Sequence, residues 1–245
     1  MKSFPMSTKD DMISQVIATR KKFPTYKSYG LATREDIWSE KNSEDAIVLQ
    51  ANDMASVYIE NKGKGKFTIQ PLPLEAQTAP VYGMTTEEIN GDGNLDLIMV
   101  GNDYGMEPYS GRHDAFNGLC LKGDGKGNFS PMHIAESGFF VMGDAKGLAR
   151  IHTAKKEDIL IATQNQDSLK VFAKNPLQSS TVLKWVSLNA DDFAAEIEYN
   201  DGKKRKVEFY YGSTYLSQSS RRIPVDKNVV KMTIVNFKGI KRTVL

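Results

Sequence analysis

The stretch Glu88-Ile-Asn-Gly-Asp-Gly-Asn-Leu-Asp96 runs directly into the apolar residues Leu97-Ile-Met-Val100, and this junction decides the fold class. A Gly- and Asn-rich turn followed by four apolar residues is typical of a short buried strand. From Ser43 onward, apolar runs of four to six residues alternate with similar turns. The sequence therefore predicts a mainly β protein built from many short strands.

This strand pattern repeats at a fixed distance. Leu95-Asp-Leu-Ile-Met-Val100 matches Glu157-Asp-Ile-Leu-Ile-Ala162, and their aspartates are 62 residues apart. Two turns, Asn61-Lys-Gly-Lys-Gly-Lys-Phe67 and Gly123-Asp-Gly-Lys-Gly-Asn-Phe129, match at the same offset of 62. Self-similarity at one period indicates a supersecondary unit that stacks on copies of itself.

A third, upstream copy is Glu44-Asp-Ala-Ile-Val-Leu49, whose Asp45 lies 51 residues before Asp96. The difference of 11 residues between the two offsets indicates an insertion in the middle copy, within 104–115. Such a period with four short strands per unit is typical of β-propeller blades, of which about four to eight close a ring. With one full unit and parts of two others, the sequence predicts a partial β-propeller.

The segment before residue 44 differs from the repeats. Apolar residues recur there at helical spacing: Met12, Ile13, Val16, Ile17 and Phe23. Thr8 with Asp11, and Thr33 with Asp36, stand at the spacing of helix-capping pairs. We therefore expect a helix after each pair, in a short N-terminal helical segment.

The segment after residue 180 differs in another way. Apolar and polar residues alternate, as in half-buried strands, over 195–199, 205–209, 229–235 and 240–245. Asn200-Asp-Gly202, between the first two, is a hairpin turn signal. We therefore expect three parts: a helical segment over 1–43, propeller-like repeats over 44–180 and a small antiparallel β domain over 181–245.

The 88–96 stretch also carries ligands for a hard cation. Positions 1, 3, 5 and 9 of this stretch carry side-chain oxygens, and they are Glu88, Asn90, Asp92 and Asp96. Asn94, at position 7, can offer its backbone carbonyl. Calcium takes six or more oxygens, and the intervening glycines let the backbone turn round a small ion. An EF-hand is excluded because Met99 stands where that loop needs Glu. We expect a calcium site; the alternative is a Gly- and Asn-rich turn without metal.

The next repeat contains a counterpart loop without these ligands. A shift of 62 residues places Glu88, Asn90, Asp92 and Asn94 on Arg150, His152, Ala154 and Lys156. Of the five ligand positions, only Asp96 keeps its residue type, as Asp158. We therefore expect no calcium in the second loop. Our hypothesis is that Arg150, Lys155 or Lys156 supplies the positive charge there instead.

Two stretches of the chain resemble known families. Glu88-Ile-Asn-Gly-Asp-Gly-Asn-Leu-Asp-Leu97 resembles the calcium loop of FG-GAP/VCBS repeats, the blades of integrin-α-type β-propellers, although Glu88 stands where Asp is usual. Tyr211-Gly-Ser-Thr-Tyr-Leu-Ser-Gln-Ser-Ser-Arg-Arg222 resembles the ASPIC/UnbV domain that follows such repeats. Together the similarities span about residues 45–245, in an order similar to the C-terminal end of large bacterial VCBS/ASPIC proteins.

The resemblance implies a function as well as a fold. It implies calcium-stabilised blades in a non-catalytic module used for cell-surface adhesion or for binding a protein or glycan ligand. It also implies an extracellular or outer-surface location, and remaining propeller blades in cis or in trans. The sequence itself shows no signal peptide, because no apolar stretch follows the lysine of Met1-Lys-Ser-Phe-Pro5.

The insertion supports an alternative function. It contributes four functional side chains: Glu107, Arg112, His113 and Asp114. Long loops on a rigid β scaffold often bind ligands, so these residues are candidate ligand-binding groups. Other interpretations are a capping loop with internal salt bridges, or a hydrolase of glycans or esters that uses residues 102–115. A further one is a scaffold that completes its propeller with another chain.

Charge and hydropathy exclude other classes. The chain has 32 basic and 30 acidic residues, and its modest basic excess lies in residues 181–245, with 12 basic and 7 acidic residues. No recognition motif accompanies that excess, so we expect no nucleic acid partner. No apolar run reaches the roughly 18 residues of a membrane span. The single cysteine, Cys120, lies in an apolar run and is expected in the core rather than as a nucleophile.

Overall fold

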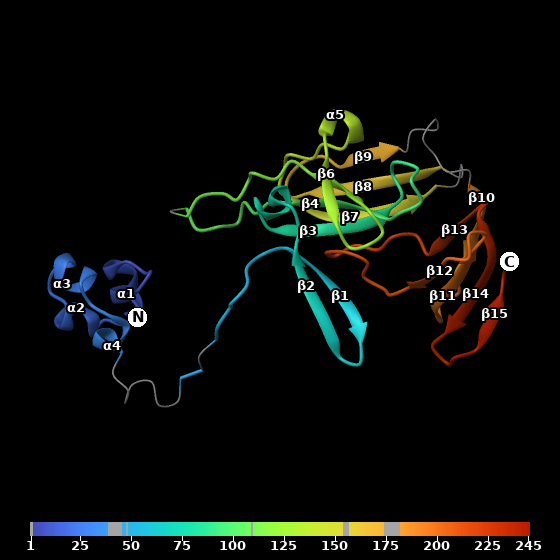
Figure 1. Ribbon diagram of the computed structural model, residues 1–245. Coiled ribbons are helices and arrows are strands. Elements are labelled where there is room, and N and C mark those ends of the chain that lie inside the picture. Colours follow the sequence, from blue (N-terminus) through green and yellow to red (C-terminus); the bar gives the residue numbers. More distant parts are fainter. Residues whose placement is uncertain (1, 39–45, 48, 109, 154–156, 174–181) are drawn as a thin grey trace. The chain divides into compact units, whose positions relative to one another are not determined.

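The computed structural model describes residues 2–38, 46–47, 49–108, 110–153, 157–173 and 182–245 (Figure 1). The chain forms two compact units, Met1–Met54 and Ala55–Leu245. Strands account for 42% and helices for 12%, which confirms the predicted mainly β class. No helix in the described part is long and apolar enough to cross a membrane. The predicted boundaries at residues 44 and 181 remain predictions.

The unit that ends at Met54 contains short helices. They are α1 (Lys9–Gln15), α2 (Thr19–Lys22), α3 (Tyr26–Gly30) and α4 (Arg34–Ile37). Thr8 and Asp11 form a capping box at α1, and Thr33 and Asp36 form one at α4, as predicted. A capping box satisfies backbone N–H groups that have no partner within the helix, which favours helix formation in such short segments.

The apolar residues of the first unit do not follow one continuous helix. The helical backbone stops at Val16, with φ −131°, and restarts as α2. Ile17 is consequently exposed. The small core of this unit consists of residues in or just after the later helices: Phe23, Tyr29, Ala32 and Ile37, with Met12 packed against them.

The upstream copy of the repeat differs from the prediction. Its described residues, Ala46, Ile47 and Leu49, lie outside any strand, and the latter two are exposed. Glu44, Asp45 and Val48 lie outside the described residues. The described part of this copy therefore does not form the strand that its likeness to 95–100 indicates.

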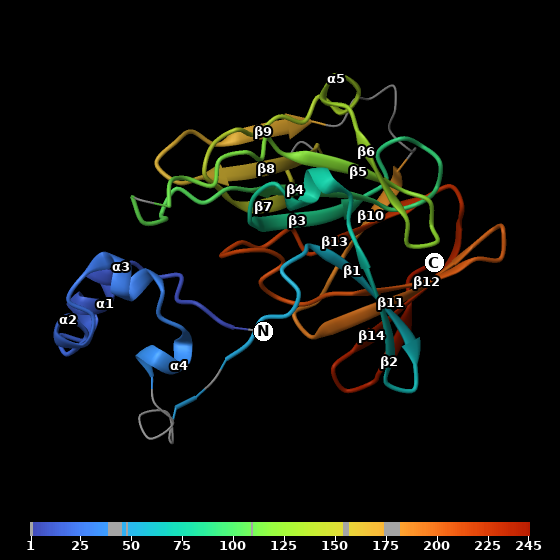
Figure 2. The same ribbon diagram turned by 60° about the vertical axis from the view of Figure 1, so that its left-hand side comes forward.

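The unit that starts at Ala55 opens with three antiparallel sheets. Their strands are β1 (Val57–Gly63), β2 (Lys66–Pro71), β3 (Val81–Glu87), β4 (Asp96–Gly101), β5 (Leu119–Gly123), β6 (Phe129–Met132), β7 (Ala145–His152), β8 (Asp158–Gln164) and β9 (Lys170–Ala173). The sheets are the pair β1-β2 and two meanders, β3-β4-β5-β6 and β7-β8-β9. A 3-10 helix, η2 (Leu74–Gln77), precedes β3, and α5 (Ile134–Ser137) follows β6. Figure 2 shows the meanders against each other, with β3 and β4 beside β7.

The sequence repeat is a repeat of structure. β4 and β8 start at Asp96 and Asp158, and β1 and β5 start at Val57 and Leu119, so each pair is 62 residues apart. The turns after β1 and β5 also correspond, because four glycines adopt positive φ at matching positions: Gly63, Gly65, Gly125 and Gly127. Within the described residues, the sheets do not form a closed propeller.

The core of the repeats lies between the two meanders. It consists of Ile98, Val100, Cys120, Met132, Phe139, Val141, Ala145, Leu148 and Ala162. Met99 lies on the opposite face of β4 and packs in a second cluster with Ala76, Phe116, Leu119 and Leu121. Because β4 is buried on both faces, its sequence is continuously apolar rather than alternating. Cys120 lies in the core as predicted, and burial raises its pKa to about 12.

The C-terminal strands form two further antiparallel sheets. They are β10 (Val182–Ser187), β11 (Asp192–Tyr199), β12 (Lys204–Glu208), β13 (Arg222–Asp226), β14 (Val229–Asn236) and β15 (Lys241–Thr243). β10 pairs with β13, and the other four are ordered β12-β11-β14-β15. The predicted hairpin is confirmed, with Ala195 opposite Val207 and Gly202 at φ 82° in the turn. Ile197, Met232 and Ile234 lie in the core of this part.

A segment with many hydroxyl groups covers the outer edge of β7. Backbone N–H groups of alternate residues donate to it at 3.1–3.2 Å: Leu148 to Thr214, Arg150 to Ser219 and His152 to Ser220. Alternate residues of a strand present their N–H groups at the same edge. Side-chain oxygens therefore replace a neighbouring strand here, and the stretch with the ASPIC/UnbV resemblance acquires a structural role.

Candidate functional site

The loop between β3 and β4 folds around its first side chain. The Glu88 carboxylate accepts hydrogen bonds from the N–H of Gly91, at 2.7 Å, and from the N–H of Gly93. Both glycines have positive φ, 87° and 83°, a conformation that favours glycine. The longer side chain of Glu88 thus spans the turn and directs its oxygens into it.

The next two predicted ligands repeat this arrangement. Asn90 Oδ1 accepts from the N–H of Asp92 at 3.1 Å, and Asp92 Oδ1 accepts from the N–H of Asn94 at 2.7 Å. The Asn90 amide also donates to Asp92 Oδ2 at 3.0 Å. The bond from the Asn94 N–H, followed by that from Asn90, lowers the pKa of Asp92 below its ordinary value of 3.8. Asp92 is therefore a carboxylate at neutral pH.

Asp96 holds the loop in place from the protein interior. It is fully buried, and its two oxygens accept from the N–H of Ile89 at 2.8 Å and the N–H of Gly123 at 3.0 Å. One carboxylate therefore joins the start of the loop to β5. Each oxygen retains a second lone pair, since a carboxylate offers about four acceptor sites.

The donor set fits calcium in part. Glu88, Asn90 and Asp92 supply side-chain oxygens from one turn, and the carbonyl of Asn94 adds another, all of the hard type that calcium prefers. In the part of the chain that the structure describes, however, no three His, Cys, Asp or Glu side chains converge as in a metal site. Coordination by all five predicted residues therefore requires the loop to close further towards Asp96.

The counterpart loop between β7 and β8 is shorter than the sequence offset indicates. The strand pairs end at Glu87–Asp96 and His152–Asp158, so eight residues lie in the first loop and five in the second. The offset along β3 and β7 is therefore 65 rather than 62. Arg150, which the constant offset matched with the first ligand position, lies within β7 instead, and that match was wrong.

Arg150 nevertheless brings positive charge to the retained aspartate. Its Nη1 lies 2.6 Å from Glu87 Oε1, and its Nε lies 3.8 Å from Asp158 Oδ1. The distance to Asp158 supports the hypothesis that a cationic side chain serves the second repeat, while the shorter distance joins Arg150 to β3. Lys155 and Lys156, the other two candidates, lie outside the described residues, as does Ala154.

An open groove of about 750 Å³ lies at the other end of the two meanders. The calcium loop precedes β4, whereas the groove is formed by segments that follow β4, precede β7 or follow β8. Its lining includes Tyr104, Arg112, Phe140, Met142, Asn165 and Phe172. Phe140 and Met142 are 43% and 57% exposed, so the groove offers apolar surface beside polar groups.

A buried amide, that of Asn102, fixes the insertion next to the groove. Asn102 is fully buried, at φ 91°, and its Oδ1 accepts from the N–H of Phe116 at 2.9 Å. Its Nδ2 donates to the carbonyls of Phe116 at 2.7 Å and of Met142 and Gly143 at 3.0 Å each. One side chain thus ties both ends of the insertion to the segment before β7.

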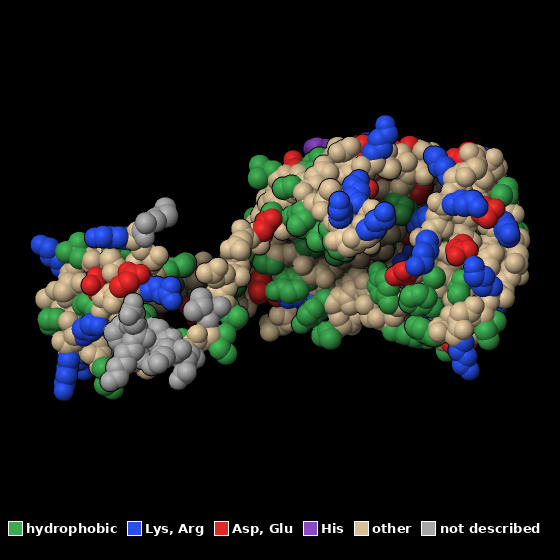
Figure 3. Space-filling view, turned by 60° about the horizontal axis from the view of Figure 1, so that its bottom comes forward, with side chains coloured by type: hydrophobic (Ala, Val, Ile, Leu, Met, Phe, Trp, Pro, Cys, Tyr) green, Lys and Arg blue, Asp and Glu red, His purple; other side chains and the backbone are tan. Residues whose placement is uncertain are grey.

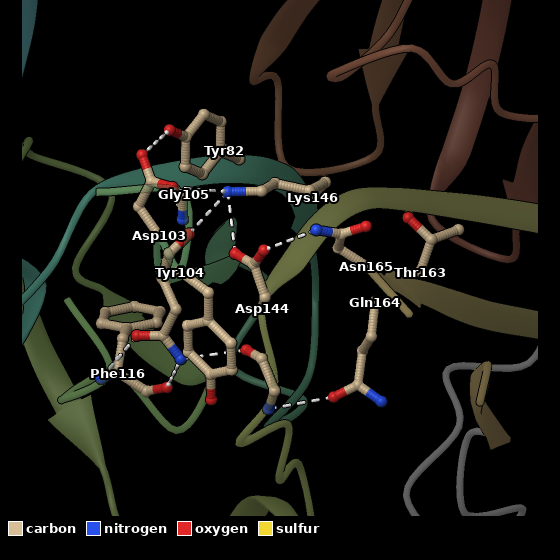
Figure 4. A network of polar contacts seen from close by, with 12 residues as sticks. Tyr82, Asp103, Tyr104, Gly105, Phe116, Asp144, Lys146, Thr163, Gln164 and Asn165 are labelled. Atoms are coloured by element: carbon tan, nitrogen blue, oxygen red, sulfur yellow. Dashed lines mark hydrogen bonds and ion pairs between the residues drawn. The ribbon is translucent and has the colours of Figure 1, made fainter. Parts of the chain in front are cut away.

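Lys146 balances the acidic groups next to this amide (Figure 4). Its Nζ lies 2.8 Å from Asp144 Oδ1, 3.7 Å from Asp103 Oδ1 and 3.7 Å from the centre of the Tyr82 ring. Burial acts to lower the pKa of Lys146, but the hydrogen bond and charge of Asp144 raise it above its usual 10.5. The Tyr82 hydroxyl donates to Asp103 at 2.8 Å. These ion pairs balance the buried charge, so the network supports the groove rather than reacting in it.

Only one of the four candidate residues of the insertion lines the groove. Arg112 does so, with its guanidinium 4.7 Å from the centre of the Tyr104 ring. Glu107, His113 and Asp114 are exposed. Over the described residues, no hydrogen bond or ion pair joins the side chains of these three. The geometry therefore offers no acid, base and nucleophile set of the kind that the hydrolase alternative requires.

Sequence reasoning missed the two amides that hold the groove walls. Asn102 and Gln164 are 62 residues apart, the offset that relates the repeats. Gln164 Oε1 accepts from the N–H of Gly143 at 2.9 Å, and its Nε2 donates to the carbonyl of Ser168 at 2.8 Å. An amide at the end of the second strand of each meander was therefore a signal available in the sequence.

The basic residues of the C-terminal sheet are interspersed with acidic ones. Its exposed ion pairs include Lys204–Glu198, Lys206–Glu208 and Lys241–Glu196. Figure 3 shows blue and red side chains mixed on the exposed face of this region. Exposed pairs contribute little to stability, but they break up the positive charge that the composition indicates.

No protein-family model matches this chain, and no curated protein matches it. The resemblance to FG-GAP/VCBS repeats and to the ASPIC/UnbV domain therefore rests on the residues quoted above.

Proposed function

We propose that this chain is a non-catalytic, calcium-binding module of propeller-type β repeats that binds a protein or glycan ligand at a cell surface. The observation that carries the proposal is the inward orientation of Glu88, Asn90 and Asp92 in one tight turn. Alternating oxygens on a turn with two positive-φ glycines favour a hard cation over an empty turn. The bacterial FG-GAP/VCBS resemblance supports an extracellular or outer-surface location.

The contrast between the two repeats also supports calcium in the first. The second loop is three residues shorter, and Arg150, which pairs with Glu87 at 2.6 Å, also lies 3.8 Å from its aspartate, Asp158. In the first loop, Asp96 receives two backbone hydrogen bonds, and Glu88 and Asp92 add further negative charge. A divalent cation in that loop would supply the charge that an arginine supplies in the other.

The groove is the proposed ligand site. It combines half-exposed apolar side chains, Phe140 and Met142, with the guanidinium of Arg112. Its walls are held by Asn102 and Gln164, so the surface is preformed. Preformed sites with a few oriented polar groups are typical of ligand recognition.

Calorimetric titration of the whole chain with calcium chloride tests the first half of the proposal. We expect saturable heat with the unaltered chain and none with Asp92→Ala. Asp124→Ala is the matched control, because Asp124 also accepts backbone N–H groups in a neighbouring exposed turn but is not a predicted ligand. Loss of binding in both variants, or in neither, would contradict the assignment of Asp92.

An array of immobilised glycans and proteins of the bacterial surface tests the second half. Met142→Asp places a charge on the exposed groove surface and should abolish any binding seen with the unaltered chain. Met84→Asp is the control, because Met84 is similarly exposed, at 56%, on β3 and does not line the groove. Binding that Met142→Asp leaves unchanged would place the ligand outside the groove.

A further inference from the structure

The hairpin of β1 and β2 corresponds to the second half of the next meander, β5 and β6. β1 and β5 start 62 residues apart, and the glycines of the two turns share positive φ. In the meander, β5 has β4 on its other side; in the described residues, β1 pairs with β2 alone. One edge of β1 therefore lacks the neighbour that its counterpart has.

The pairing of β4 with β5 defines what that neighbour looks like. Leu97 lies opposite Leu121, and Met99 lies opposite Leu119. Asp96, which precedes this apolar run, accepts a hydrogen bond from the N–H of Gly123 at 3.0 Å. The strand that fits beside β5 thus begins with an acidic residue and continues with apolar ones.

The backbone of β1 presents its free groups in the same register. Leu72 N–H donates to the carbonyl of Ser56 at 3.0 Å, so hydrogen-bonded pairs with β2 fall on even-numbered residues of β1. The N–H and C=O groups of Val57, Ile59 and Asn61 therefore point away from β2. In β5, the residues whose backbone N–H and C=O groups face β4 lie 62 positions after these same three residues.

The exposure of the side chains also indicates that a neighbouring strand is missing beside β1. Ile59 is 55% exposed, whereas Leu121, its counterpart on β5, is fully buried. On the partner strand β2, Phe67 and Ile69 are 58% and 62% exposed. Monomeric proteins usually protect such an edge, because an unpaired strand with apolar side chains is a template for another strand.

We propose that β1 accepts a β-strand from a partner polypeptide, and that this strand begins with Asp or Glu and continues with four apolar residues. The donor is another polypeptide because β4 and β8, the strands of this type in residues 55–245, are already paired on both edges, and the described residues of the upstream copy, Ala46, Ile47 and Leu49, lie outside any strand. The strand adds by backbone pairing with Val57 and Ile59, and its acidic side chain accepts from the N–H of Asn61. This inference rests on the repeat interpretation within the proposed function, but not on calcium or on the groove.

Hydrogen exchange of the whole chain, with a synthetic peptide of the sequence Leu-Asp-Leu-Ile-Met-Val-Gly from 95–101 as probe, tests the proposal. Added terminal lysines keep the peptide soluble. At about millimolar peptide, we expect exchange at Val57, Ile59 and Asn61 to slow at least about tenfold, with no change in β11 and β14. A peptide with Leu97→Pro lacks an N–H that faces β1 and should give no protection.

Two variants of one residue separate backbone pairing from side-chain contact. Ile59→Ala and Ile59→Pro both remove the side chain, but only proline removes the outward N–H, at an edge position that tolerates it. We expect the peptide to protect Ile59→Ala more weakly and Ile59→Pro not at all, while exchange in β2 stays the same. No protection by the peptide, equal protection by the Leu97→Pro peptide, or amides already protected in the free chain would each overturn the proposal. Calcium titration of the same samples shows separately whether the calcium assignment holds.

Discussion

The Thr214 hydroxyl group bridges the backbone of Leu148. It accepts from the Leu148 N–H at 3.2 Å and donates to the Leu148 carbonyl at 2.8 Å. One side chain thereby satisfies both polar groups that an edge strand would otherwise leave unpaired. The segment 213–220 therefore closes β7 against further strand addition, whereas β1 has no such cover in the described residues.

Replacement of Thr214 by valine should expose the cost of leaving those groups unpaired. Thr214→Val keeps the shape of the side chain but removes the hydroxyl group, so we expect a loss of about 1–2 kcal/mol in unfolding free energy. Thr68→Val is the control, because Thr68 is exposed on β2 and should change stability by less than about 0.5 kcal/mol. Urea denaturation of both variants measures the difference, and equal values would show that the bridge contributes nothing.

Removal of the Lys146 ammonium group should be more harmful. Asp144 is almost fully buried, and Lys146→Met leaves its charge without a cationic partner, so we expect a loss of about 3 kcal/mol. Lys206→Met removes one partner of an exposed pair with Glu208 and should cost less than about 0.5 kcal/mol. Thermal unfolding at neutral pH compares the two, and similar melting temperatures would contradict the account of the network.

The Lys146 network also predicts a dependence on pH. The pKa of Lys146 is raised above 10.5 in the folded chain, so the stability it contributes is complete below pH 10.5 and disappears as pH rises through the folded value. The pKa of Asp103 is lowered below 3.8, mainly by the Gly105 N–H, so its contribution is present above 3.8 and disappears as pH falls through the lowered value. Urea denaturation of the unaltered chain should therefore show a constant contribution of these two groups to the unfolding free energy between about pH 5 and 9. A slope within that window would show that other groups control it.

Substitutions should show that Asp96 stabilises the fold, whereas Asp92 binds calcium. Asp96→Asn turns an N–H-bearing nitrogen towards a backbone N–H, so we expect about 2–4 kcal/mol of destabilisation without calcium. Asp92 is exposed, and Asp92→Asn should cost less than about 1 kcal/mol while it weakens calcium binding. Urea denaturation in a chelator measures the first effect, and calorimetry measures the second. Equal stability losses would remove the distinction between the two roles.

Cys120 should be unreactive in the folded chain. The residue is only 3% exposed, and burial raises the pKa of its thiol to about 12, so little thiolate exists at neutral pH. We expect a thiol reagent such as Ellman's to react only at the rate of unfolding, and promptly in denaturant. Fast reaction under native conditions would show that β5 is not covered by the second meander as described.

The repeats were predictable because they depend on local signals. Alternating turns and apolar runs located β4 and β8, and two capping pairs located α1 and α4, since each signal lies within a few residues. The position of Arg150 was not predictable from a constant offset, because a loop can shorten by three residues without changing the strands on either side. The Asn102 bonds to Met142 and Gly143 join residues about forty positions apart, which no periodic pattern reveals. The described residues of 44–49, Ala46, Ile47 and Leu49, lie outside any strand, because a sequence suited to a strand does not by itself fix the pairing that makes one.

Residue-resolved nuclear magnetic resonance during a calcium titration of the whole chain shows whether the 88–96 loop binds calcium. The account predicts saturable shifts of the amide signals of Gly91, Gly93 and Asn94, because their N–H groups bind the oxygens that would face the ion. It also predicts no shift at Thr153 and Glu157 in the shorter loop of the second repeat, which serves as the internal control. No shift in 88–96 at about 10 mM calcium, or equal shifts in both loops, would contradict the account, since even weak extracellular sites bind at about millimolar calcium.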